Sequence, residues 1–147
     1  MTGESLARLE YFSDHMPGLF RKISEDDFAS KPRPDKWSKK EILGHLIDSA
    51  TNNHQRFLRV RFEDTPTIVY DQEKWNNFTH YNKLDSEFII SFWVIYNKFI
   101  IKLLKDIPEE DLLRKCIIND GETVTLGWLI DDYVKHMEHH LRQITDY

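Results

Sequence analysis

The segment from residue 88 to residue 104, FIISFWVIYNKFIIKLL, is the most apolar part of the chain. Asn97, Lys98 and Lys102 interrupt it, so it falls short of the roughly 20 apolar residues that a membrane-spanning helix needs. A surface helix carries a single apolar stripe, whereas this segment is apolar on nearly every side. We therefore expect a helix that begins near Asp85, ends before Pro108 and is buried on more than one side.

Three other segments repeat apolar residues at spacings of three and four, the period of an amphipathic helix. They cover residues 5–23, 38–62 and 126–146. Pro17 is expected to kink or split the first of them. Ser38 and Glu41 form the S-x-x-E capping box that opens the second, and Thr125 can cap the last. Four helices of this kind predict an all-α, four-helix bundle.

The connections complete this prediction. Residues 63–83 form a long middle connection that contains Pro66, and we expect either a functional loop or a short helix flanked by loops. Asp120 and Gly121 lie between β-branched stretches, a pattern typical of a small β-hairpin just before the last helix. At 147 residues, the chain is expected to form a single domain over residues 1–147.

Composition excludes several classes of function. The chain has 20 Lys and Arg residues against 25 Asp and Glu residues, a net charge of −5, so nucleic acid is not an expected partner. The amino terminus lacks the basic start and apolar run of a secretory signal, and we expect a cytoplasmic protein that does not bind a membrane. Cys116 is the single cysteine, so any metal must be held by histidine or carboxylate.

His136 and His140 lie four residues apart at the edge of the apolar stripe of the last helix, whereas His139 points away from that stripe. Such a pair is a common way for one helix to offer two imidazoles to a metal. The alternative is a pair of partly buried histidines that form hydrogen bonds with neighbouring groups. A third ligand would favour the metal site.

A line of polar residues runs beside the apolar face of the second helix. It consists of His45, Ser49, Asn52 and Arg56, at spacings of 4, 3 and 4. Long charged side chains normally occupy an outer face, so we interpret this line as the lining of a cleft. The alternative is a hydrogen-bond network between helices. His45 is the candidate for the third ligand.

Three motifs carry a family resemblance: KWSKKEILGHLIDS, YDQEKW and HMEHHLRQI. In this order they resemble the DinB-like superfamily, and most closely its YfiT-type branch of metal-dependent hydrolases, which includes bacillithiol S-transferases. The resemblance covers the chain from about Lys36 to its end. It implies a four-helix bundle that binds one divalent metal ion, nickel or zinc, through three histidines. The matching positions are His45, His136 and His140.

The resemblance also implies roles for residues around the metal. Asp48, Ser49 and Arg56 match an Asp-Ser pair and an arginine that follow the first histidine, and Tyr70 and Asp71 match a motif in the middle loop. The candidate catalytic residues are therefore Asp48, Arg56 and Asp71, and the candidate cofactor- or substrate-binding residues are Ser49, Asn52 and Tyr70. Gln143 stands where a relative can have histidine, which concerns the surroundings of the metal rather than its ligands.

Three imidazoles leave open positions on a metal, as catalytic sites do. A metal in such a site lowers the pKa of bound water or holds a thiol as its thiolate. We favour transfer of a low-molecular-weight, bacillithiol-like thiol to an electrophile, because the resembling branch includes that activity. The alternatives are hydrolysis of a small amide or ester and a non-catalytic, metal-binding stress-response bundle. Phe92, Trp93 and Phe99 belong either to the core or to a homodimer interface, and we expect a homodimer.

Overall fold

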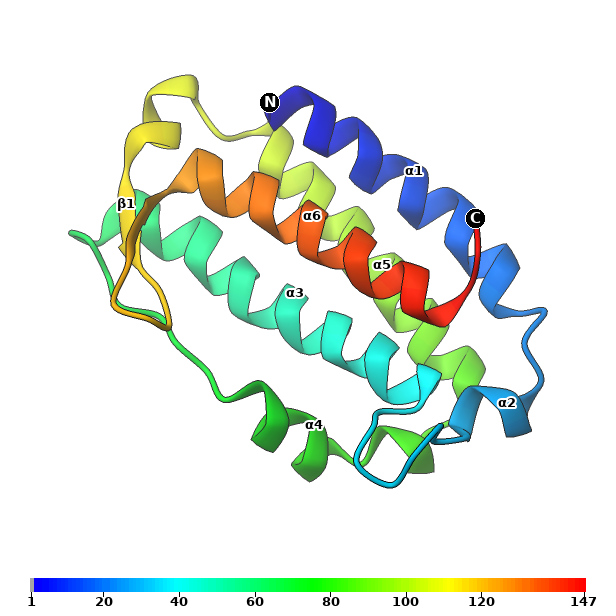
Figure 1. Cartoon of the computed structure of the whole chain (residues 1–147). Coiled ribbons are helices and arrows are strands. Elements are labelled where there is room, and N and C mark those ends of the chain that lie inside the picture. Colours follow the sequence, from blue (N-terminus) through cyan, green and yellow to red (C-terminus); the bar gives the residue numbers. More distant parts are fainter. Residues whose placement is uncertain (1) are drawn as a thin grey trace.

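A computed structural model describes residues 2–147 and shows four long helices packed side by side (Figure 1). They are α1 (Thr2–Phe20), α3 (Lys39–Phe62), α5 (Ser86–Lys105) and α6 (Leu126–Ile144). α3 lies against α6 and α5, and α1 lies against the same two helices. The predicted all-α, four-helix bundle is thus confirmed.

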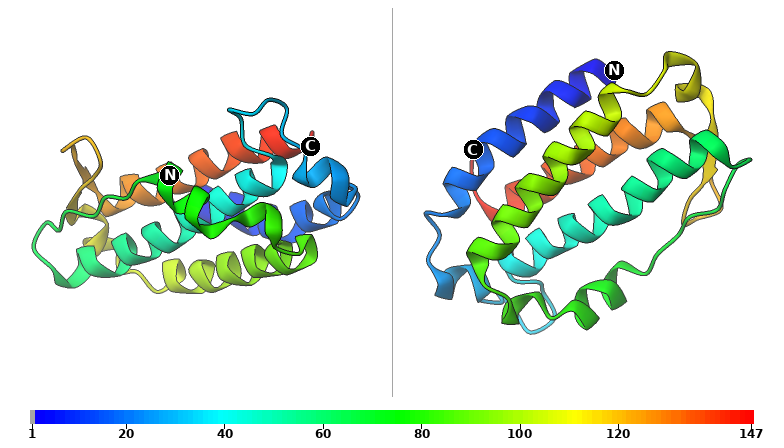
Figure 2. Two further views of the ribbon diagram at one scale, coloured as in Figure 1. Left: turned by 90° about the horizontal axis from the view of Figure 1, so that it is seen from below. Right: turned by 180° about the vertical axis from the view of Figure 1, so that it is seen from behind.

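Short elements occupy the connections, some at the ends of the bundle and one, α4 (Gln72–Thr79), beside α3 (Figure 2). They are α2 (Glu25–Ala29), α4 (Gln72–Thr79), η1 (Tyr81–Lys83), η2 (Glu109–Leu113), β1 (Lys115–Ile117) and β2 (Thr123–Thr125). The long middle connection therefore contains a short helix flanked by loops, the second of the two alternatives. The sequence pattern did not predict α2.

The expected hairpin is present before α6. β1 pairs with β2 in antiparallel register, with Cys116 opposite Val124, and Gly121 in the turn has a positive φ of 75°. The amide of Ile68 also donates to the carbonyl oxygen of Ile117 over 3.1 Å. The hairpin thereby holds the segment that follows α3, and this segment forms one wall of the candidate site.

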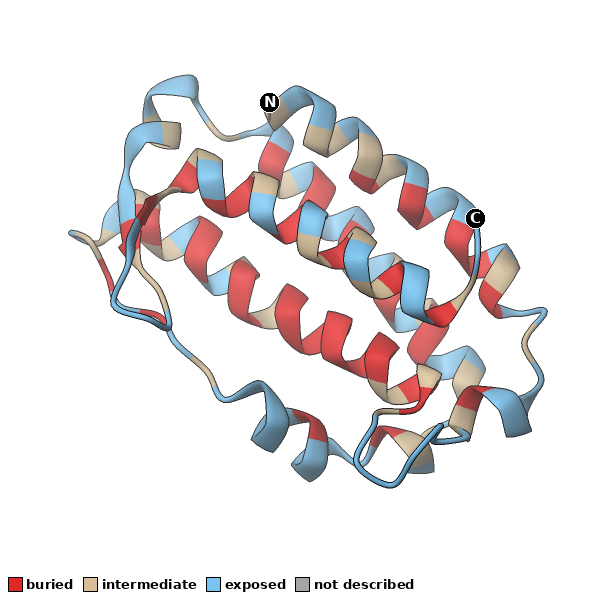
Figure 3. Ribbon diagram, in the orientation of Figure 1, coloured by how far each residue is buried: buried red, intermediate tan, exposed pale blue. Residues whose placement is uncertain are grey.

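The core lies between the four long helices, whose inward faces are buried (Figure 3). Trp93 is fully buried and therefore belongs to the core. Asn97, which interrupts the apolar segment, is also buried and accepts a hydrogen bond of 2.6 Å from the hydroxyl of Tyr133. Its amide donates to the carbonyl oxygen of Trp93, so both polar atoms of this buried side chain have a partner.

The first helix differs from its predicted form. It begins at Thr2 and ends at Phe20, and it continues through Pro17 without being split. Proline removes one backbone donor, and here only a single turn of helix follows it. The cost is therefore confined to the end of the helix, where Arg21 still donates to the carbonyl oxygen of Pro17.

The expectation that α5 is buried on more than one side is wrong for its outer face. Phe88, Phe92, Ile95 and Phe99 are exposed there, with between 45% and 67% of each residue accessible. The main contacts of α5 are with α1 and α3. Even so, no helix within residues 2–147 combines the length and the apolar character needed to cross a bilayer.

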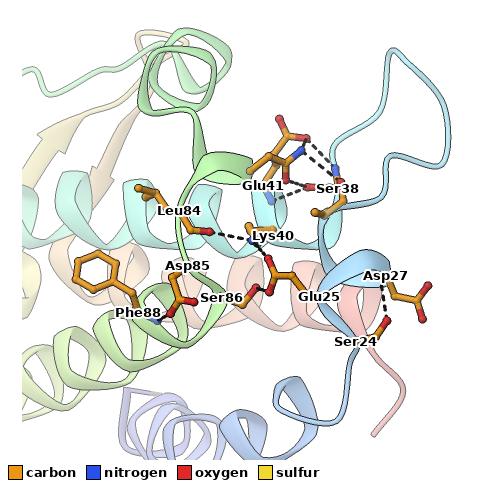
Figure 4. Close-up of polar contacts among 12 residues, drawn as sticks. Ser24, Glu25, Asp27, Ser38, Lys40, Glu41, Leu84, Asp85, Ser86 and Phe88 are labelled. Carbon is orange, nitrogen blue, oxygen red and sulfur yellow. Dashed lines mark hydrogen bonds and ion pairs between the residues drawn. The ribbon is translucent and has the colours of Figure 1, made fainter.

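A polar cluster fixes the start of α3 (Figure 4). Ser38 and Glu41 form the predicted capping box. Lys40 is buried, donates to the carbonyl oxygen of Leu84 over 2.9 Å and forms an ion pair with Glu25. A buried ammonium needs such pairing. The cluster therefore ties α2 and the start of α5 to the end of α3 that carries His45.

Candidate metal centre

Three histidines from two helices converge inside the bundle. His45 comes from α3, and His136 and His140 come from α6. Each offers one ring nitrogen, and these nitrogens all lie within 4.8 Å of one another. Nε2 of His45 is 3.1 Å from Nε2 of His136. The structure thus brings together the three positions that the family resemblance implied.

Neighbouring residues hold the His45 ring in place. His45 is fully buried in the first half of α3. The ring of Trp37, just before the capping box, packs against it with a centroid distance of 4.9 Å. The Nδ1 atom of His45 is buried and has no hydrogen-bond partner among residues 2–147, while the Nε2 atom of His45 faces His136.

Burial keeps the three imidazoles neutral. Loss of solvent, reinforced by the neighbouring histidines, lowers the pKa of His45 to about 3. The same causes lower the pKa of His136 to about 4, and burial also lowers the pKa of His140. A histidine must be neutral to coordinate a metal. The cluster therefore offers three neutral imidazoles at physiological pH, each able to coordinate through one ring nitrogen.

The surroundings of His140 also suit a ligand. Its Nδ1 lies 2.8 Å from Oε1 of Gln143, and Nε2 of Gln143 lies 3.2 Å from Nε2 of His139. With Nδ1 donating to the Gln143 oxygen, the lone pair of His140 is on Nε2. Histidines that bind metals usually donate their second nitrogen in this way. His139 itself is exposed and lies outside the cluster.

The spacing of the ring nitrogens suits a single metal ion. Nitrogen ligands about 2.0–2.1 Å from a tetrahedral zinc ion lie roughly 3.3 Å apart. The 3.1 Å separation between His45 and His136 is close to that spacing. Three neutral nitrogens, mounted on two packed helices, therefore fit one divalent ion.

Asp48 lies one turn after His45 and is nearly buried. The hydroxyl of Tyr81 donates to its Oδ1 over 2.5 Å, and its Oδ2 has no partner among residues 2–147. Burial raises the pKa of Asp48 to about 6, although the Tyr81 hydrogen bond acts in the opposite direction. Sequence reasoning missed Tyr81. The signal that could have found it is Gly44, a glycine inside a helix, because the Tyr81 ring occupies the space of its missing side chain.

Arg56 is a buried cation with neutral partners, and only 8% of it is exposed. Its Nη2 and Nε donate to the carbonyl oxygen of Ile68 over 2.8 and 3.2 Å. Longer contacts of 3.4 and 3.5 Å reach the side-chain oxygens of Asn53 and Asn119. It forms no ion pair with any carboxylate in the described part of the chain.

Two cavities reach the histidine cluster. One, of about 230 Å³, is lined by Ser49, Arg56, Tyr70 and His136, and we call it the Arg56 cavity. The other, of about 420 Å³, is lined by Trp37, Ile42, His140 and Gln143, and we call it the Trp37 cavity.

Two of the remaining candidates take part in contacts away from the cluster. The side-chain amide of Asn52 donates to the backbone carbonyl of Asp48 within α3. Asp71 is exposed and caps α4 by accepting a hydrogen bond from the amide of Lys74 over 3.0 Å. Of the polar line on α3, the Arg56 cavity is lined by Ser49 and Arg56 but not by Asn52.

Comparisons with known proteins place this arrangement in a family. A relative from Oceanobacillus iheyensis named "putative metal-dependent hydrolase" is 27% identical over 84% of this chain and 72% of its own length. A second relative of that name from the same organism is 24% identical over 96% of this chain and 82% of its own length.

Two solved structures resemble the fold. YfiT from Bacillus subtilis, described as "a probable metal-dependent hydrolase with an unusual four-helix bundle topology", superposes with a TM-score of 0.84 at 22% identity, covering 97% of this chain and 83% of YfiT. A mutant of the mycothiol-dependent maleylpyruvate isomerase superposes with a TM-score of 0.81 at 11% identity, covering all of this chain and 62% of the isomerase. The sequence pattern of the DinB superfamily matches residues 8–144, and the chain belongs to that superfamily.

Proposed function

We propose that this protein is a divalent-metal-dependent enzyme that transfers a low-molecular-weight thiol to an electrophilic carbon. The observation that carries the proposal is the cluster of His45, His136 and His140, three neutral imidazoles of which His140 lines one cavity and His136 lines another. A reaction between two small molecules needs two binding spaces that share one reactive centre. Imidazole nitrogens suit both nickel and zinc.

A divalent ion held by the three histidines would supply Lewis acidity, which lowers the pKa of a thiol that it binds. The imidazoles bring no charge of their own, so the site favours a ligand that becomes negative. The rigid packing of α3 on α6 fixes the three nitrogens before any substrate arrives, which lowers the entropic cost of orienting the reactants.

Asp48 is the proton acceptor in this proposal. With a pKa of about 6, the Asp48 carboxyl is mostly ionised at pH 7 to 8. Its Oδ2 atom has no hydrogen-bond partner among residues 2–147 and can take up a proton. The thiol proton passes to this carboxylate, the sulfur forms a bond to carbon, and chloride leaves when the electrophile is a chlorinated compound. Asp71, the other acid considered, is exposed and already caps α4.

The Trp37 cavity is the proposed space for the electrophile. Trp37 and Ile42 give it apolar surface beside charged lining residues, and His140 connects it to the cluster. The Arg56 cavity is more polar, and His136 connects it to the cluster. It therefore suits the thiol substrate. The mycothiol-dependent isomerase supports a thiol substrate, because that protein has a similar fold and is named as dependent on a thiol.

Hydrolysis of a small amide or ester is the second candidate. The names of the Oceanobacillus relatives and of the YfiT structure favour it. In a hydrolase, Asp48 would accept a proton from water instead of a thiol. A bundle that binds a metal without turnover is the third candidate.

One experiment separates the three candidates. Protein purified without an affinity tag is analysed for metal and then mixed with a thiol and a chlorinated electrophile, while chloride release and thiol loss are followed. We expect about one metal ion per chain and chloride release in step with thiol loss. Ester or amide hydrolysis without thiol would favour the hydrolase, and bound metal without either reaction would leave the non-catalytic bundle. Absence of metal would overturn all three.

A further inference from the structure

The Arg56 cavity contains a buried positive charge that the protein does not neutralise. The partners of the Arg56 guanidinium are a backbone carbonyl and two side-chain amide oxygens. A buried cation without a carboxylate partner is costly, and burial accordingly lowers the pKa of Arg56. An anion that enters the cavity would remove this cost, and a carboxylate matches the guanidinium by forming two parallel hydrogen bonds.

The same cavity carries acidic groups near solvent. Asp120 and Asp132 both line it, and both residues are exposed. Neither forms an ion pair in the described part of the chain. Partial loss of solvent raises the pKa of the Asp132 carboxyl, and the charges of Lys135 and Arg56 counteract this rise only in part. The cavity thus has a cation in its buried wall and unpaired acids toward its mouth.

We propose that the Arg56 cavity binds the amino-carboxylate end of the thiol substrate, with the carboxylate on Arg56 and the ammonium group facing Asp120 and Asp132. This inference rests on the proposed thiol transfer and names the chemical class of the thiol, an α-amino acid thiol of the cysteine type. His136 lines the same cavity, so a short thiol held at its charged end can direct its sulfur toward the histidine cluster.

Size and charge both restrict the occupant. The cavity volume of about 230 Å³ is below the roughly 300–1,000 Å³ of sites for drug-sized ligands, so it suits a fragment as small as an amino acid. Asp120 and Asp132 would repel a second negative charge near the mouth. A phosphate or sulfate group is therefore a poorer occupant than a carboxylate that carries a neighbouring ammonium group.

Four thiols test the proposal on the protein as purified. L-cysteine carries both charged groups, 3-mercaptopropionate only the carboxylate, cysteamine only the ammonium group, and 2-mercaptoethanol neither. Calorimetric titration gives the dissociation constant of each. Since a hydrogen-bonded charge contributes on the order of a tenfold change or more in affinity, we expect L-cysteine to bind at least about tenfold more tightly than either singly charged thiol. Equal affinities for all four thiols would overturn the proposal.

Variants of the cavity test which side chain binds each charged group of the ligand. Arg56→Met should remove the advantage conferred by the carboxylate, and Asp132→Asn should reduce the advantage conferred by the ammonium group. Arg59→Met is the matched control, because Arg59 lies on the same helix but pairs with Glu63 outside the cavity. It should leave the order of affinities unchanged.

Further measurements guard against misfolding of the variant and separate cavity binding from thiol transfer. Arg56 also holds the Ile68 carbonyl, so Arg56→Met is first checked for its thermal unfolding. If that variant does not fold, the ligand series on the unaltered protein and Asp132→Asn still decide the outcome. L-alanine, propionate and ethylamine are titrated as well, since they test the cavity without a thiol. A preserved preference for L-alanine without any turnover would count against thiol transfer but not against this cavity.

Discussion

Oε1 of Gln143 lies 2.8 Å from Nδ1 of His140, and both residues belong to α6. His139 engages the amide nitrogen of the same side chain, which orients the amide oxygen toward His140. Gln143 thus occupies the place of the hydrogen-bond acceptor that usually supports a histidine ligand. The sequence resemblance raised this position as a departure from relatives, and the structure gives it a supporting role.

Loss of this support should weaken metal binding. Gln143→Leu removes the acceptor for His140, and we expect a roughly 10- to 100-fold loss of metal affinity with little change in helix content. Gln143→Glu, which keeps an acceptor, should retain most of the affinity. Competition with a chromogenic chelator measures both variants. Equal affinity of Gln143→Leu and the unaltered protein would show that the contact does not support the site.

Alanine substitutions should separate ligands from bystanders. His45→Ala, His136→Ala and His140→Ala each remove one nitrogen of the cluster and should each greatly reduce the metal content. His139→Ala is the matched control, since His139 is exposed and lies outside the cluster. Metal analysis of the four purified variants is the measurement. Equal loss from His139→Ala and His140→Ala would contradict the assignment.

Acid should release the metal only at low pH. The pKa values of His45 and His136 are lowered to about 3 and about 4, so protons compete weakly for these nitrogens above pH 5. We expect the metal to be retained at pH 5 and lost as the pH approaches 4. Metal content after equilibration at each pH gives the curve. Release near pH 6.5 would indicate that the histidines titrate as if exposed.

The metal-free protein should lose stability as the pH falls, and this loss should begin at a higher pH than the release of the metal. Unfolded histidines take up protons below about pH 6.5, whereas His45 and His136 in the folded state do not until about pH 4 or 3. Asp48 opposes this between about pH 6 and pH 3.8, because its folded pKa is raised. Two histidines outweigh one aspartate, so stability should fall on the order of 1 kcal/mol per pH unit near pH 5. Urea unfolding at pH 7 and pH 5 measures the difference.

Gly44 cannot accept a side chain without displacing Tyr81. A Cβ atom there would lie 2.2 Å from the Tyr81 ring. Gly44→Ala should therefore cost roughly 1–3 kcal/mol and separate Tyr81 from Asp48. The control is Gly18→Ala on α1, where a Cβ atom would meet nothing within 4 Å and stability should be unchanged or higher. Urea unfolding compares the two, and equal stability would contradict the close packing.

The exposed stripe on α5 should mediate a homodimer. Phe88, Phe92, Ile95 and Phe99 repeat at spacings of 4, 3 and 4, as in the seam between two paired helices. In an antiparallel pair, Asp85 near one end of the helix would meet Lys102 of the second copy near the other end. Neither of these two residues forms an ion pair within residues 2–147. Contiguous exposed apolar residues of this kind commonly mark an interface.

Substitution of this stripe gives the test of the dimer. Ile95→Lys should yield a monomer in light scattering, whereas the unaltered protein should have the mass of two chains. Leu113→Lys is the control, because Leu113 is 75% exposed but lies in η2, away from the stripe. A monomeric unaltered protein would remove the expected dimer.

Local signals in the sequence were sufficient for much of the fold. The capping box at Ser38 and the cap at Thr125 place the starts of α3 and α6, because these hydrogen bonds join residues three apart in sequence. α2 escaped prediction because five residues are too few to show a helical period. The outer face of α5 was misjudged because an apolar pattern does not tell how many neighbours a helix has.

The candidate site was predictable in its ligands but not in its supports. His136 and His140 reveal themselves by local spacing, and His45 by its place in a polar line. The Tyr81 hydrogen bond to Asp48 joins residues 33 positions apart, so no local pattern contains it. The same holds for Arg56 and the carbonyl of Ile68, which depend on how the middle connection folds back over α3.

His45 and His136 are separated by 91 positions in sequence, and they meet only when α6 has docked on α3. An unfolded chain therefore offers a metal little more than the local pair on α6. Because a ligand that binds only the native state draws the folding equilibrium toward that state, the apparent stability of this protein should rise with the concentration of free metal. The supply of metal in the cell would then influence how much of the chain stays folded, besides how much of it is active.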